Sequence, residues 1–87
     1  MDTAAIEERT LGPEWDTELL TRLRFAVLAV RGTMTEASYA VAGSQEVITY
    51  DISLPDGRLT ATCETFVGLS IKGPGHLVKQ LDHVGVA

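Results

Sequence analysis

The chain has 87 residues, 45% of them apolar, a formal net charge of −5 and a single cysteine. This length fits one domain, and the excess of acids disfavours binding to a nucleic-acid backbone. One cysteine excludes an internal disulfide and a cysteine-pair zinc site, and no apolar run approaches the roughly 20 residues of a membrane-spanning helix.

The N-terminal segment is polar and acid-rich, without a helical or strand period. It lacks the basic start and apolar core of a signal peptide, so we expect a cytoplasmic protein with no membrane association. We expect a flexible tail over residues 1–11, anchored at most through Ile6 and Leu11, and a single domain over residues 12–87.

A first helix is predicted from Pro13 to Arg31. Proline is tolerated at the first helical position, and Asp16 is a competing N-cap. Gly32 is the expected left-handed residue that ends the helix. Apolar residues recur at the three-and-four spacing of an amphipathic helix: Trp15, Leu19, Leu23, Ala26 and Val30.

The second half of this helix is apolar all round. Phe25 and Leu28 lie away from the main stripe, on the side that carries Thr21. A helix that is apolar on every side is usually buried on every side. We therefore expect either the second helix or the tail to cover Phe25 and Leu28, or another chain to do so.

The segment from Thr33 to Gln45 is ambiguous. Alternation favours a short strand from about Ala37 to Ala42, followed by a tight turn at Gly43-Ser44. The alternative is a loop with one helical turn. We favour the strand, because an isolated two-stranded hairpin is only marginally stable.

Residues 46–67 predict a β-hairpin around Pro55-Asp56-Gly57, because apolar and polar side chains alternate on both sides of the turn. A three-residue loop would set apolar side chains opposite polar ones. A four-residue loop sets Leu54 opposite Leu59 and buries one face, so we favour it despite the turn statistics. In that register Tyr50 faces Cys63, and Val47 faces Phe66 on the outer, otherwise polar side.

Beyond the hairpin, Gly68 predicts a bulge or bend. Leu69 and Ile71 then belong to a bent fourth strand or extend the third. A second helix is predicted after Gly73-Pro74-Gly75, ending at Gly85. The predicted fold is α+β: an N-terminal helix, an antiparallel meander of three to four strands and a C-terminal helix, with both helices on one sheet face.

The residues that could perform chemistry favour structural roles. Cys63 points inward in the favoured register and would be inert. His76 and His83 are seven positions apart, roughly 10 Å along a helix, which is too far to share a metal ion. Asp51 and Glu64 would be diagonal neighbours on the outer face, where acid–base catalysis and simple solubility are the two interpretations. We therefore predict no catalytic residues, no metal and no cofactor.

Surplus apolar surface is the better functional indication, because exposed apolar patches mark interfaces. The candidate binding residues are Trp15, Phe25, Leu28, Val47 and Phe66. We expect a small acidic protein that binds another protein, as an inhibitor, immunity factor, adaptor or accessory subunit, rather than an enzyme. The partner would be a protein with a basic surface or a second copy in a homodimer. The alternative is a small-molecule pocket between the first helix and the sheet, with Tyr50, Cys63 and Trp15 as walls.

Overall fold

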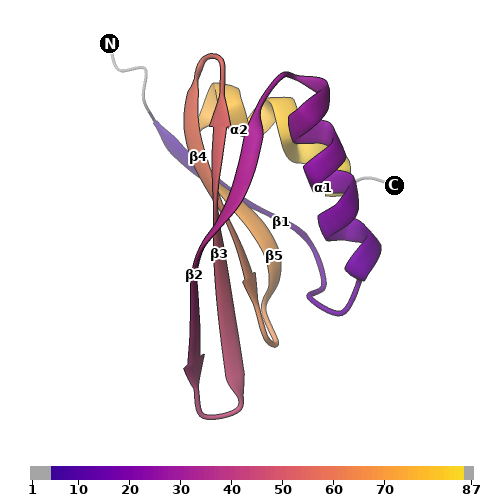
Figure 1. The fold of residues 1–87 in the computed structure, drawn as a ribbon, viewed down its shortest axis with the longest axis vertical. Helices are drawn as coiled ribbons and strands as arrows, with labels where there is room; N and C mark the ends of the chain where they lie inside the picture. The colour runs from indigo at the N-terminus through magenta and orange to yellow at the C-terminus, as the bar shows by residue number, and fades with distance from the viewer. Residues whose placement is uncertain (1–4, 86–87) are drawn as a thin grey trace.

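The computed structural model describes residues 5–85 and shows one antiparallel sheet with helices on one of its faces (Figure 1). The strands lie in the order β1-β5-β4-β3-β2, and every neighbouring pair is antiparallel. This confirms the α+β class and the antiparallel sheet. In chain order the elements are β1 (Ile6–Gly12), α1 (Thr17–Ala29), β2 (Thr33–Ala42), β3 (Gln45–Leu54), β4 (Gly57–Glu64), β5 (Gly68–Pro74), α2 (Gly75–Leu81) and the 3-10 helix η1 (Asp82–Gly85).

The first element is a strand, which corrects the predicted order. The sequence predicted a flexible tail over residues 1–11, but Ile6–Gly12 forms β1 and pairs along β5. Residues 1–4 lie outside the described part of the chain. Within β1 only Leu11 is buried, so backbone hydrogen bonds to β5 hold this strand in place. Its side chains therefore show little of the apolar alternation by which a strand is recognised in a sequence.

Helix α1 begins and ends with recognisable caps. The Asp16 carboxylate accepts a hydrogen bond of 3.1 Å from the backbone N–H of Glu18, so Asp16 rather than Pro13 starts the helix. At the other end the Gly32 N–H donates to the Val27 carbonyl at 2.8 Å, and Arg31, with φ of 65°, is the left-handed residue. The prediction that Gly32 would be left-handed was wrong. Gly32 is needed for close packing instead, since an added Cβ would lie 2.5 Å from a Leu54 methyl carbon.

Strand β2 is longer than predicted and is joined to β3 by a two-residue turn. It runs over Thr33–Ala42, with a bulge between Glu36 and Ser38. Ala42 pairs with Gln45, and Gly43 has φ of 65°. Glycine at the first turn position with positive φ is typical of a tight hairpin turn. The strand prediction was therefore correct in kind and too short at its start.

The β3–β4 register differs from the predicted one by two residues. Leu54 pairs with Gly57 across a two-residue loop, and Ile52 pairs with Leu59. Apolar side chains still face apolar ones, so burial did determine which side chains of the hairpin point toward the core. However, Tyr50 pairs with Ala61 rather than Cys63. The chain then turns at residues 65–67, and Gly68 begins β5 with φ of 117°.

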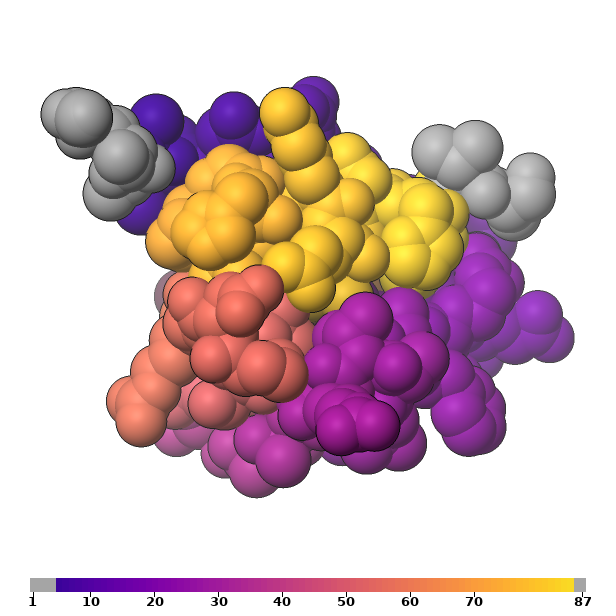
Figure 2. Space-filling model, turned by 90° about the horizontal axis from the view of Figure 1, so that it is seen from above, coloured from indigo at the N-terminus to yellow at the C-terminus, as the bar shows by residue number. Residues whose placement is uncertain are grey.

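The core lies between the helices and one face of the sheet. From α1 it takes Leu19, Leu23 and Val27, and from α2 it takes Leu77, Val78 and Leu81. These side chains cover Ile52, Ala61 and Ile71 on the central strands, which are at most 1% exposed. Seen from above, α2 lies between β1 and the β3–β4 turn and beside α1, and the four form a closely packed upper end (Figure 2).

Candidate functional site

Large apolar side chains remain exposed outside this core. Phe66 and Trp15 are the most exposed, at 76% and 75%. An isolated exposed apolar residue is normal, but a group of them on one element marks an interface. The large apolar residues that are more than half exposed are Ile6, Trp15, Phe25, Leu28, Tyr39, Val41, Phe66 and Val67.

The outer side of α1 carries two of them. Phe25 is 67% exposed and Leu28 is 58% exposed, and residues three apart are neighbours on a helix surface. We call this pair the helix ridge. It lies on the side of α1 away from the buried Leu23 and Val27. Within residues 5–85 neither the second helix nor β1 covers it.

Arginines lie beside the ridge. The Arg24 guanidinium donates a hydrogen bond of 3.3 Å to the Met34 carbonyl and lies 5.9 Å from the centre of the Tyr50 ring. Arg24 is thus fixed against the edge of the sheet next to Leu28, and Arg31 follows just after the helix. Glu18 lies in the first turn of α1, and Glu14 lies in the loop before the helix. Acidic side chains are thus found at the start of α1, Arg24 near its middle and Arg31 just beyond its end.

The remaining predicted binding residues lie on other elements. Trp15 precedes α1 in the loop that leads into the helix. Phe66 lies in the β4–β5 turn with φ of 70°. Val47 is half-buried and pairs with Glu64, so it does not face Phe66 as predicted. Of the five predicted residues, Phe25 and Leu28 share one element, while the loop that carries Trp15 lies beside the β4–β5 turn of Phe66, since an added Cβ on Gly68 would be 3.6 Å from the Pro13 Cα.

Sequence reasoning missed a second exposed apolar pair, on β2. Tyr39 and Val41 are 55% and 58% exposed and lie on edge strand β2, in its half toward the β2–β3 turn. That turn projects beyond β4 and β5 (Figure 1). Tyr39 pairs with Ile48, whose side chain packs against the core, so the pair lies on the helix side of the sheet. Its sequence signal is a run without charge, from residue 37 to residue 45.

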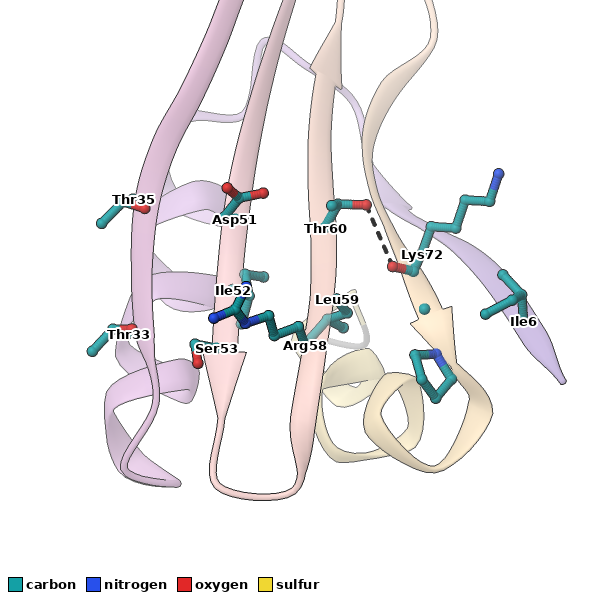
Figure 3. Close-up of a pocket in the computed structure, with 12 residues that line it drawn as sticks. Ile6, Thr33, Thr35, Asp51, Ile52, Ser53, Arg58, Leu59, Thr60 and Lys72 are labelled. Carbon is teal, nitrogen blue, oxygen red and sulfur yellow. Dashed lines mark hydrogen bonds between the residues drawn. The ribbon is translucent and has the colours of Figure 1, made fainter. Parts of the chain in front are cut away.

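The face of the sheet opposite the helices is open and polar. It holds a shallow depression of about 760 Å³. In Figure 3 the side chains of Asp51, Thr60 and Lys72 stand on three successive strands above this depression, with the helices behind the sheet. Thr60 pairs with both Asp51 and Lys72, and its hydroxyl donates to the Lys72 carbonyl at 3.4 Å.

The two carboxylates considered for acid–base chemistry do not meet. Asp51 pairs with Thr60, whereas Glu64 pairs with Val47, four residues further along the hairpin. At about 3.3 Å per residue this places their backbones about 13 Å apart along the strands. The predicted diagonal contact between Asp51 and Glu64 depended on the wrong register.

Tyr50 lies in the core and Cys63 packs against it, and both stay protonated at neutral pH. Burial, and then the charge of Glu14, raises the pKa of the Cys63 thiol. Burial raises the pKa of Tyr50, with smaller contributions from Cys63 and Glu36, while Arg24 lowers it. A protonated thiol is a poor nucleophile. His76 and His83 are both exposed, and within residues 5–85 no three His, Cys, Asp or Glu side chains gather as metal ligands.

The space between α1 and the sheet is occupied by core side chains. Tyr50 is 5% exposed and Trp15 is 75% exposed, so these two do not wall a common pocket there. None of the helices in residues 5–85 has the length and apolarity to cross a bilayer. Comparisons of the chain with protein-family models, curated proteins and solved structures find no match.

Proposed function

We propose that this chain works by binding another protein, with the helix ridge of Phe25 and Leu28 as its docking surface. The observation that supports this is the exposure of both side chains on a helix whose other side is fully packed. Burying such a side chain is worth about 1.5–3 kcal/mol. Large apolar anchors of this kind carry most of the binding energy in protein interfaces.

Charge would guide the encounter. The net charge of −5 favours approach by a protein with a basic surface. At short range the acidic side chains at the start of α1, Glu14 and Glu18, and the arginines beside and beyond the ridge, Arg24 and Arg31, would orient the partner along the helix. This role as an inhibitor, immunity factor, adaptor or accessory subunit needs no catalytic residues.

The test uses two surface variants of the same helix. The ridge variant carries Phe25→Gln and Leu28→Gln. The control carries Thr17→Gln, which changes an exposed position in the first turn of α1, eight residues before Phe25 and about 12 Å from it along the helix. Wild type and both variants are immobilised and exposed to the proteins of the native cell, and retained proteins are quantified by mass spectrometry.

We expect at least one protein to be retained by wild type and by the control, and to be lost from the ridge variant. Purified, that protein should bind wild type and the control with equal affinity. Equal retention by all three forms would overturn the proposal, and so would no retention by any of them.

The open sheet face supports a second candidate, the binding of a small polar molecule. Its motivation is the depression of about 760 Å³ with Asp51, Arg58 and Lys72 around it. A ligand of the folded state raises the apparent midpoint of thermal unfolding. A metabolite that raises the midpoint of wild type but not of an Arg58→Ala/Lys72→Ala variant would support this candidate. A library without any such compound would dismiss it.

A further inference from the structure

The two edges of the sheet differ in chemistry. Strand β1 carries Glu7, Glu8 and Arg9 among its seven residues. Strand β2 carries one charge, Glu36, among its ten. Natural proteins place charges, prolines and bulges on edge strands to prevent pairing with another chain. The β1 edge is protected in this way, whereas the β2 edge beyond its bulge is not.

The unprotected part of β2 is Ser38–Ala42. It is free of charge and proline, and it follows the bulge at Glu36/Ser38. Because Ala42 and Gln45 close a two-residue turn, they form a hydrogen-bonded pair. Hydrogen-bonded and non-hydrogen-bonded pairs alternate along an antiparallel ladder. The backbone groups of Ser38 and Ala40 therefore point toward β3, and those of Tyr39 and Val41 point outward from the sheet.

We propose that β2 pairs antiparallel with β2 of a second copy of this chain, with Ala40 of one copy opposite Ala40 of the other. In this register Tyr39 lies opposite Val41 twice, once on each side of the two-fold axis. Both residues have outward backbone groups, so the two strands exchange hydrogen bonds there. An aromatic side chain opposite a β-branched one is a favourable cross-strand pair.

Neighbouring registers are worse. Centring the pair on Tyr39 would set Val41 opposite Ala37, where the bulge interrupts the ladder. Centring it on Val41 would leave only residues 40–42 to pair before the turn begins. Pairing centred on Ala40 therefore includes the longest regular and uncharged part of the β2 edge.

A second copy also fits the apolar surface. Two chains of net charge −5 repel each other, and a contact through the uncharged residues 37–45 adds no further repulsion. A two-fold axis through Ala40 joins Tyr39, Val41 and Ile48 of the two copies into one apolar strip on the helix side. The inference rests on the proposed role in protein binding, but on a different surface from the helix ridge.

The first test is the oligomeric state by analytical ultracentrifugation, from about 1 μM to about 100 μM. We expect a wild-type dimer, a monomeric Val41→Lys variant and a dimeric Val67→Lys variant. Val67 is the matched control, with 53% exposure against 58% for Val41. Circular dichroism confirms that both variants are folded. A monomeric wild type, or a dimeric Val41→Lys, would overturn the inference.

The second test determines the register of the β2–β2 pairing between the two copies, and it uses a chain that carries Cys63→Ala. An Ala40→Cys pair would lie across the two-fold axis at about 4.5 Å between Cα atoms, within the range that a disulfide bridges. Ser38→Cys is the control, because Ser38 would lie opposite Ala42. We expect Ala40→Cys to form the interchain disulfide at least tenfold faster in a glutathione buffer. Equal rates would overturn the register.

The helix-ridge variant separates the two proposals. We expect it to remain a dimer. If it becomes monomeric, the ridge is the contact between copies and β2 pairing is wrong. If it stays dimeric but loses its cellular partner, both proposals hold.

Discussion

At the scale of single residues, Gly68 meets the strictest steric requirement. Its φ is 117°, and an added Cβ would lie 2.4 Å from the carbonyl oxygen of Gly12. Gly43 also has positive φ, at 65°, but nothing lies within 4 Å of its added Cβ. A side chain at Gly43 would therefore cost only an unfavourable backbone conformation. A side chain at Gly68 would cost the same and would also clash with the backbone of Gly12.

We expect Gly68→Ala to destabilise the protein more than Gly43→Ala. Both substitutions cost about 1–2 kcal/mol through positive φ, and Gly68→Ala must also displace the β1–α1 connection at Gly12. Urea unfolding of the two variants and wild type gives the free energies of unfolding. Equal losses of stability in the two variants would show that the Gly12 backbone moves aside without measurable cost.

Cys63 makes stability depend on pH. An unfolded thiol has a pKa of about 8.5, and in the folded chain burial and Glu14 raise the pKa of Cys63. Above about pH 8.5 the unfolded thiol has lost its proton while the folded one retains it. The free energy of unfolding therefore falls as pH rises toward the folded pKa. Below about pH 8.5 this contribution is fully present.

We expect Cys63→Ala to lose less stability than wild type between about pH 7.5 and about pH 9.5. The pKa of Tyr50 is also raised, but an unfolded tyrosine ionises only near pH 10, so this window isolates the thiol. Urea unfolding at several pH values measures both slopes. Parallel slopes would contradict the effect of Cys63.

At the scale of elements, strong local patterns were predictable from the sequence. The three-and-four spacing located α1, and period-two alternation located β3 and the apolar side of the β3–β4 hairpin. The register was missed by two residues, because both registers bury the same face and differ only in cross-strand partners. Edge strand β1 was missed because its partner β5 lies about 60 residues away in sequence, and its own side chains carry almost no apolar period.

The candidate site was predictable only in part. Phe25 and Leu28 stand out because they lie off the helix stripe, and the structure leaves them exposed. For Tyr39 and Val41 the uncharged run over residues 37–45 is only a weak signal, since an alternating strand looks the same whether its edge is paired or free. Only the strand order, with β2 last in the sheet, distinguishes these cases.

The Asp16 cap is the element-scale feature most open to direct measurement. Its carboxylate accepts from the Glu18 N–H at 3.1 Å, so Asp16→Ala leaves a helix N–H without its protein partner. We expect Asp16→Ala to cost about 1 kcal/mol of stability. Asp16→Asn keeps an oxygen acceptor and should stay within a few tenths of a kcal/mol of wild type. Urea unfolding compares the three forms, and a large loss in Asp16→Asn would mean that charge, rather than capping, stabilises the helix.

At the scale of the whole molecule, α1 carries large apolar side chains on both its inner and its outer side. Leu23 is fully buried against the sheet, whereas Phe25, two residues later, is 67% exposed. Residues two apart on a helix point about 200° apart, so only one of the two can face the core. The inner side of α1 therefore belongs to the core, and we propose that the outer side binds a partner.

Two side-chain truncations compare how much the inner and the outer side of α1 contribute to the stability of the fold. Leu23→Ala should cost about 2–5 kcal/mol, because it removes a packed side chain and leaves a cavity. Phe25→Ala should change stability by no more than about 0.5 kcal/mol, because it removes a side chain that is mostly in water. Urea unfolding at a fixed protein concentration compares them, since association would otherwise contribute to stability. A costly Phe25→Ala in a chain shown to be monomeric would mean that the ridge belongs to the fold, and the binding proposal would lose its main support.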